Sequence, residues 1–197
     1  MSQKKEQDLS TLTDGTLVGY FLQTNDKKVL SVLYQRHAAW IYHKCLALVK
    51  STESAEDLTH DIFLRAFLKL STLKEPERLR GWLSTIAYNM SINFLNLRRD
   101  FQGETIDTHH QLSATDEESR EEASLREITL VELERLLQHL PDSDRVILLM
   151  RFQDEMSIKE IQETLKIGES AVKMRLKRAK EKLARLFEES KTEIRYE

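Results

Sequence analysis

The stretch SIKEIQETLKIGESAVKMRLKRAKEKLARLF, residues 157–187, decides the fold of the C-terminal part of the chain. Ser157 can cap a short helix over Ile158–Leu165, because its hydroxyl can accept a hydrogen bond from an orphan backbone N–H. Lys166-Ile167-Gly168 then forms a tight turn. A second, longer helix is predicted to begin at about Glu169–Ser170. The segment therefore predicts a helix-turn-helix.

The longer helix has one apolar side and one polar side. Its apolar residues repeat at four and three, which is typical of a helix packed along one stripe: Val172, Leu176, Ala179, Leu183 and Leu186. The opposite face carries Ser170, Ala171, Met174, Lys177 and Arg178, with Lys173 and Arg175 at its flanks. Such a face suits the major groove of DNA, where basic groups neutralise phosphates and outward groups approach base edges. The alternative is a solvated basic face on an ordinary bundle helix.

The composition extends the helical prediction to the whole chain. Among 197 residues only 5 are Gly and 2 are Pro, too few for the turns of a sheet protein of this length. An all-β fold and an α/β fold with glycine-rich phosphate loops are therefore excluded. The net charge is −3, yet residues 170–187 hold seven bases and one acid, which indicates a polyanionic partner at one place.

The sequence gives little support to an enzyme. Cys45 is the only cysteine, so neither a disulfide framework nor a cysteine-based zinc site is expected. The six histidines form no HExxH pattern, and no nucleophile triad or phosphate loop is visible, so we expect no catalytic residue, metal or cofactor. No apolar run approaches the 18 or so residues of a membrane span. We therefore expect a cytoplasmic protein without membrane insertion.

Two helical domains on a tether are predicted. The first covers residues 12–99, and the second covers residues 125–189. Between them, residues 100–124 are acidic and poor in apolar side chains, a composition that cannot offset the entropy of ordering a backbone. The expected fold class is all-α, with residues 100–124 as a flexible acidic linker.

Within the first domain, a helix from Ser54 to about Leu70 presents an unusual outward face. Ser54 with Asp57 forms a capping-box pattern at its start. Two apolar residues lie beside two acids on its free side, which carries Asp57, His60, Asp61, Leu64, Arg65 and Leu68. This combination indicates a protein contact surface. The alternative is a helix that is buried on more than one side.

The next helix, Leu79–Arg99, has a second unusual face. It is expected to bury Leu79, Leu83, Ile86, Ala87, Met90, Phe94 and Leu97. Its other side would show Thr85, Tyr88, Asn89, Ile92, Asn96 and Arg99, with Arg98 near the edge. Aromatic, amide and guanidinium groups together can stack on and hydrogen-bond unpaired bases. The alternative is that Tyr88 and Trp82 are core aromatics.

Four motifs, in order along the chain, resemble bacterial RNA polymerase sigma factors of the sigma-70 family. LYQRH at Leu33–His37 resembles the opening of region 2, and AEDLTHDIFLRAF at Ala55–Phe67 resembles its core-binding helix. GWLSTIAYNMSINFLNLRR at Gly81–Arg99 is similar to the promoter-melting helix, and residues 133–187 are similar to region 4. Regions 1 and 3 have no counterpart, as in the extracytoplasmic-function (ECF) subfamily.

The resemblance implies partners and roles. Core polymerase would be bound through Asp57, Asp61, Leu64 and Arg65 on the β′ clamp helices, with region 4 against the β-flap. The melted −10 element would meet Tyr88, Asn89, Ile92, Asn96, Arg98 and Arg99. The −35 element would meet Ser170, Ala171, Lys173, Met174, Arg175, Lys177 and Arg178. An anti-sigma factor is a further expected partner.

The sequence departs from the family pattern in three places. LKEPERLRG at Leu73–Gly81 replaces the commoner Gly-Asp-Ser-type loop, so the −10 base preference does not carry over. Gln162 stands where the first helix of a helix-turn-helix usually has Ala. Lys166 stands where such turns usually have Gly, at a cost of about 1 kcal/mol if it is left-handed. The alternative functions are a helix-turn-helix regulator with a sensing or dimerisation domain, and a helical adaptor without a nucleic-acid role.

Overall fold

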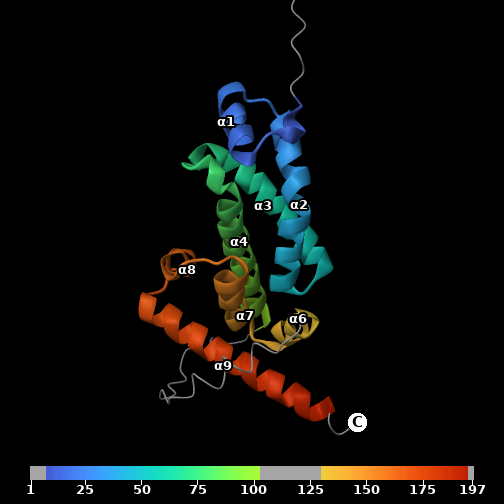
Figure 1. Cartoon of the computed structure of the whole chain (residues 1–197), viewed down its shortest axis with the longest axis vertical. Coiled ribbons are helices and arrows are strands. Elements are labelled where there is room, and N and C mark those ends of the chain that lie inside the picture. The colour runs from blue at the N-terminus through green and yellow to red at the C-terminus, as the bar shows by residue number, and fades with distance from the viewer. Residues whose placement is uncertain (1–7, 103–129, 195–197) are drawn as a thin grey trace, which may run out of the picture. The chain divides into compact units, whose positions relative to one another are not determined.

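The computed structural model describes residues 8–102 and 130–194, and all its regular structure there is helical (Figure 1). The chain divides into two compact units that meet between Ile92 and Asn93, within one long helix. The all-α prediction is confirmed. The predicted linker, residues 100–124, lies outside the described residues except at its start, where the helix predicted to end at Arg99 continues to Gln102.

The first unit contains most of the N-terminal helices. In chain order they are η1 (Leu9–Thr11), α1 (Asp14–Thr24), α2 (Lys28–Val49), α3 (Thr52–Lys69), η2 (Leu70–Thr72), η3 (Pro76–Arg78) and the N-terminal part of α4 (Leu79–Gln102). Asn25 and Lys50 end α1 and α2 in the left-handed conformation, with φ of 53° and 58°. These left-handed caps turn the chain sharply, so α2 packs directly on both its sequence neighbours.

The start of α3 differs from the sequence prediction. The Ser51 hydroxyl accepts a hydrogen bond from the Ser54 N–H at 3.3 Å, so the cap is Ser51 and Ser54 lies inside the helix. The predicted cap at Ser54, with its capping box to Asp57, is therefore wrong. Both serines offer a suitable hydroxyl, and the choice falls on the one that follows the left-handed Lys50.

The core of the first unit contains a buried cation. Lys44 is 2% exposed, and its ammonium lies 5.1 Å from the ring centre of Trp40 and 4.8 Å from that of Tyr88. The Arg80 guanidinium covers Trp40 at 4.6 Å. Electrostatic attraction between a cation and the face of an aromatic ring stabilises such stacks. The stack joins α2 to α4 and fixes the side of α4 that faces inward.

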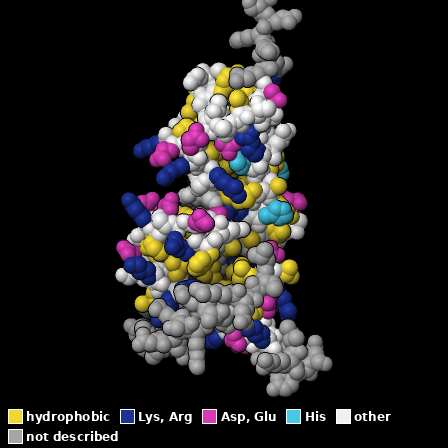
Figure 2. Space-filling model, viewed as in Figure 1, with side chains coloured by type: hydrophobic (Ala, Val, Ile, Leu, Met, Phe, Trp, Pro, Cys, Tyr) yellow, Lys and Arg dark blue, Asp and Glu magenta, His cyan; other side chains and the backbone are white. Residues whose placement is uncertain are grey.

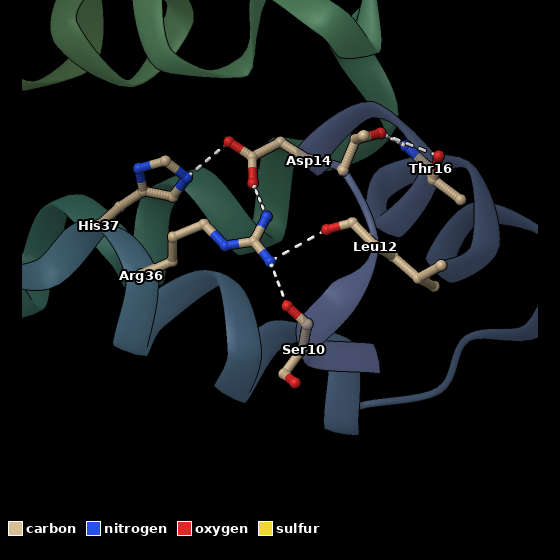
Figure 3. A network of polar contacts seen from close by, with 7 residues as sticks. Ser10, Leu12, Asp14, Thr16, Arg36 and His37 are labelled. Carbon is tan, nitrogen blue, oxygen red and sulfur yellow. Dashed lines mark hydrogen bonds and ion pairs between the residues drawn. The ribbon is translucent and has the colours of Figure 1, made fainter. Parts of the chain in front are cut away.

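A polar network holds the start of α1 against α2 (Figure 3). The Asp14 carboxylate pairs with the Arg36 guanidinium and accepts a hydrogen bond from His37 Nε2 at 2.8 Å. Arg36 also donates to the backbone carbonyls of Ser10 and Leu12, at 3.1 and 3.0 Å. Charge-assisted bonds of this kind are stronger than neutral ones. The N-terminal turn of α1 is therefore fixed in place from the α2 side.

The second unit is built around a short buried helix. Its elements after α4 are α6 (Leu130–His139), α7 (Asp142–Leu148), one π-helical turn η4 (Leu149–Gln153), α8 (Ile158–Leu165) and α9 (Glu169–Ile194). Arg145 of α7 is 1% exposed and donates to the Leu140 carbonyl at 3.1 Å and to Asp142 at 2.7 Å. Lys182 of α9 reaches Asp144 at 2.5 Å. These bonds give the buried Arg145 and Asp144 side chains partners of opposite charge and attach α9 to α7.

Candidate nucleic-acid and protein interfaces

The helix-turn-helix forms where the sequence predicts it. The Ser157 hydroxyl accepts from the Glu160 N–H at 3.2 Å, and Glu160 Oε2 accepts from the Ser157 N–H at 2.8 Å, a complete capping box. Lys166 ends α8 with φ of 56°, the left-handed conformation expected of a position that usually holds Gly. α9 begins at Glu169. The predicted bounds of both helices at the turn are confirmed.

Exposure along α9 follows the predicted two-sided pattern. Val172, Leu176, Ala179 and Leu183 are buried, whereas Leu186 is half-buried and Phe187 takes the last buried place. On the other side Ser170, Ala171, Lys173, Met174 and Arg175 are exposed, and Lys177 and Arg178 are half-buried. The first two turns of α9 therefore present small, apolar and basic groups to solvent.

An ion pair at the start of α9 was not anticipated. Lys173 Nζ lies 2.6 Å from Glu169 Oε1, one helical turn away. The hydrogen bond from Lys173, and then its charge, hold the pKa of the Glu169 carboxyl below its usual range. The spacing of four residues is the signal that sequence reasoning overlooked.

On the face drawn in Figure 2, acidic and basic side chains are interspersed. An anion that binds on that face would therefore be attracted by the basic groups nearest to it.

The outward face of α3 is confirmed as a surface. Asp57, Asp61 and Arg65 are exposed, and Leu64 and Leu68 are 61% and 77% exposed. Leucine side chains at such exposure, flanked by carboxylates, form a small apolar surface with an acidic rim.

α3 also contacts α2 beside this face. His60 stacks beside Tyr34 of α2, with the Tyr34 hydroxyl 3.4 Å from His60 Nδ1. This contact holds α3 against α2, so the outward acids lie on a helix whose inner side is packed.

The outward face of α4 differs from the prediction at two positions. Tyr88 is 0% exposed, so the expectation that it faces outward is wrong: its ring packs on the Lys44 ammonium instead. Leu97, expected in the core, is 59% exposed. Asn89 and Ile92 are half-buried, while Asn96 and Arg98 are exposed.

Two polar side chains near the C-terminal end of α4 contact each other. The half-buried Arg99 donates through Nη2 to the side-chain amide oxygen of Asn96, Oδ1. The contiguous outward surface of α4 is therefore smaller than predicted and lies toward its C-terminal half.

Two further observations concern chemistry and membranes. Within residues 8–102 and 130–194, no three His, Cys, Asp or Glu side chains gather where they could hold a metal ion. Over the same described residues, no helix is both long and apolar enough to cross a membrane.

The fold thus defines a two-part helical protein that carries a helix-turn-helix in its second unit. Residues 33–100 match the family model Sigma-70 region 2, and residues 130–183 match Sigma-70, region 4. Together the two matches take in more than half of the chain. The chain belongs to the sigma-70 family of RNA polymerase sigma factors, and its relatives place it in the ECF subfamily.

Named relatives are moderately similar in sequence. The RNA polymerase sigma factor YlaC of Bacillus subtilis is 28% identical over 163 residues, which is 83% of this chain and 94% of that protein. The ECF RNA polymerase sigma factor SigW of the same organism is 27% identical over 154 residues, covering 73% and 80%. The probable RNA polymerase sigma factor RfaY of Xanthomonas campestris is 29% identical over 68% of this chain, but the match spans 34% of that protein's length.

Solved structures agree on the fold. CnrH, in complex with the cytosolic domain of CnrY, has a TM-score of 0.57 at 20% identity, covering 89% of this chain and 97% of that one. The sigma factor RpoE of Bartonella quintana, in complex with the anti-sigma factor NepR, has a TM-score of 0.57 at 18% identity, covering 83% and 98%. At these identities the likeness shows a shared fold.

Proposed function

We infer that this protein is an ECF sigma factor that binds core RNA polymerase and directs promoter recognition, DNA melting and transcription initiation. The observation that carries the inference is that one chain matches both region 2 and region 4 and has a helix-turn-helix in the latter. A helix-turn-helix regulator with a sensing domain would not need the region 2 match. A sigma factor does no chemistry of its own, so its residues act by contact alone.

Core polymerase would be bound by the outward face of α3. Asp57 and Asp61 supply negative charges, Arg65 supplies a positive one, and Leu64 supplies an exposed apolar side chain. This combination is suited to a protein surface whose charges are complementary to these. The site on the polymerase would be the β′ clamp helices, and the β-flap would receive the second unit.

The −35 element would be read by the first turns of α9. Ser170, Ala171 and Met174 are small or flexible enough to approach base edges in the major groove. Lys173 and Arg175 flank them and would neutralise phosphates, with Lys177 and Arg178 behind. The second helix of a helix-turn-helix lies in this way in the groove.

The melted −10 element would be held by α4 and the segment before it. Asn96 and Arg98 are exposed, Asn89, Ile92 and Arg99 border them, and amide and guanidinium groups hydrogen-bond unpaired bases. Tyr88 is left out of this surface because it is buried. The segment before α4 is Leu73–Arg78, and it leads directly into the first residue of α4, Leu79.

An anti-sigma factor is proposed as a regulatory partner. RpoE of Bartonella quintana was solved with an anti-sigma factor, and CnrH with the cytosolic domain of CnrY. In this chain the exposed Leu64 and Leu68 and the basic side of α9 are the surfaces that such a partner would cover. We further propose that the protein acts in the cytoplasm, where the polymerase is found.

The deciding experiment is transcription in vitro with purified core polymerase and a genomic promoter library. We expect specific initiation from a limited set of promoters only when this protein is added. A protein that binds duplex DNA tightly by itself but neither binds core nor starts transcripts would support the regulator instead.

A further inference from the structure

The N-terminal turn of α1 meets the segment that precedes α4. Gly15 is buried, and a Cβ built on it would overlap the end of the Glu77 side chain, with Oε2 at 2.7 Å. Glu77 belongs to η3, the short helix within the Leu73–Gly81 segment. The Glu77 carboxylate therefore occupies the space that any side chain at position 15 would need.

The N-terminus of α1 and the Glu77 carboxylate are electrostatically complementary. Thr13 caps α1 and its hydroxyl accepts from the Thr16 N–H at 3.2 Å, but the earliest N–H groups of a helix have no partner within the helix. Those groups give a helix N-terminus a partial positive charge, which favours a nearby carboxylate. Glycine at position 15 lets the Glu77 carboxylate come close to this backbone.

The start of α1 is itself held rigidly. Arg36 and His37 of α2 bind Asp14, and Arg36 also binds the carbonyls of Ser10 and Leu12. Any group that docks on this turn is therefore placed relative to α2 as well.

Few buried side chains hold the middle of the Leu73–Gly81 segment. Leu73 and Leu79 are 8% and 2% exposed, Pro76 is half-buried, and the other residues between the two leucines are exposed: Lys74, Glu75, Glu77 and Arg78. The Arg78–Glu75 ion pair, at 3.0 Å, joins two residues of the segment itself. The contact of Glu77 with α1 thus ties the exposed middle of the segment to the rest of the unit.

We propose that Gly15 and Glu77 are positioning residues that set the conformation of the segment before α4, and through it the choice of −10 sequence. Neither residue touches DNA in this proposal; α1 acts on promoter recognition only by holding η3. The proposal rests on the function proposed above.

Gly15→Ala tests it with little risk to the fold. The added methyl group meets the end of a flexible side chain, so Glu77 moves while the backbone stays, and Ala is the better helix former. Gly19→Ala is the matched control, because it makes the same change in the same helix with nothing within 4 Å. Glu77→Gln, which keeps the size and removes the charge, is the third variant.

The measurement is transcription by reconstituted holoenzyme on promoters with randomised −10 elements. For Gly15→Ala and Glu77→Gln we expect discrimination between the best and the median −10 sequence to fall roughly five- to tenfold. Core affinity and −35 preference should equal those of Gly19→Ala. The melting temperature should equal that of Gly19→Ala or exceed that of wild type. Adding Gly15→Ala to Glu77→Ala should change discrimination no further, since the displaced carboxylate is already absent.

Each outcome has a distinct meaning. Unchanged −10 discrimination in both variants, with a wild-type holoenzyme that does discriminate, overturns the positioning role alone. The same loss in Gly19→Ala would attribute the effect to helix propensity and also overturn it. A wild-type protein that starts no promoter-specific transcripts contradicts the proposed function instead.

Discussion

α9 and α4 differ in how much of their circumference is covered by the rest of the chain. Over its first turns α9 is packed along one stripe, centred on Val172 and Leu176, and is open elsewhere. α4 has buried or half-buried side chains around most of its N-terminal half, including Tyr88 and Ser91 at 0% exposure. An amphipathic pattern therefore locates the outward face of α9 well and that of α4 poorly. The predictions below test whether this difference in packing separates surface residues from structural ones.

The largest effect is expected on α3, whose outward face resembles that of α9 in being open. Asp57→Lys with Asp61→Lys should abolish co-purification with core polymerase, because both charges reverse on a surface that does not support the core of the domain. The control is Glu75→Lys, which reverses an exposed charge on the segment before α4, outside the surfaces proposed to bind core, and should leave core binding intact. Retention of core by a folded α3 variant would remove this face from the interface.

The next prediction separates structure from recognition on α4. Tyr88→Ala should lower the free energy of unfolding by about 3 kcal/mol, since it leaves a cavity and removes the ring over Lys44. Asn96→Ala, on the exposed part of α4, should change stability by no more than about 0.5 kcal/mol. Chemical denaturation measures both. A Tyr88 variant as stable as wild type would mean that the buried stack contributes little.

Sequence reasoning succeeds where local chemistry decides the structure. Ser157 with Glu160, Lys166 and Gly168 mark the ends of α8 and the start of α9 by capping alone, and the chain follows them. It fails where two local signals compete or where a distant residue decides. Ser51 and Ser54 both suit a cap, and Tyr88 is buried because Lys44, far away in sequence, provides a cation beneath it.

The contact of Glu77 with Gly15 belongs to the same group of failures. Nothing near Gly15 in sequence indicates that its missing side chain makes room for a residue of a later segment. The outward acids of α3 and the outward residues at the start of α9 were predictable because their exposure to solvent follows the helical period of the sequence.

A smaller effect is expected within α9. Lys173→Ala should lower the slope of log affinity against log salt by about one for all promoters, because one phosphate contact is lost. Met174→Ala should instead change the preferred −35 bases, since Met174 is 54% exposed on the outward face. Arg185→Ala, exposed further along the same helix, is the control. Binding-site selection at several salt concentrations gives both quantities, and identical base preferences in all variants would contradict this register.

The smallest effect concerns Cys45, beneath α4. Burial raises the pKa of its thiol, although the nearby Thr59 and Ser91 side chains and the Lys44 charge act in the opposite direction. The folded protein should therefore resist alkylation at roughly pH 8.5, where a free thiol is half ionised, and react once unfolded.

The same shift has a consequence for stability against pH. The neutral thiol is favoured in the folded state, so its contribution is present below the ordinary thiol pKa and is lost as pH rises above it. Stability measured against Cys45→Ala should thus decline at alkaline pH. In the alkylation experiment, rapid labelling of the Cys45 thiol in the native protein would show that α2, α3 and α4 open readily around this residue.

The meeting of α1 with η3 also imposes an order on synthesis. Gly15 and the N-terminal turn of α1 leave the ribosome first, whereas Glu77 is added about 60 residues later, or about 3 to 12 seconds at ordinary rates of translation. During that interval α2 and its neighbours can pair through contacts close in sequence, which form fastest. The newly made chain must then close a loop of about 60 residues to join η3 to α1, so the segment proposed to meet promoter DNA takes its place only after α2 and α3 have been made.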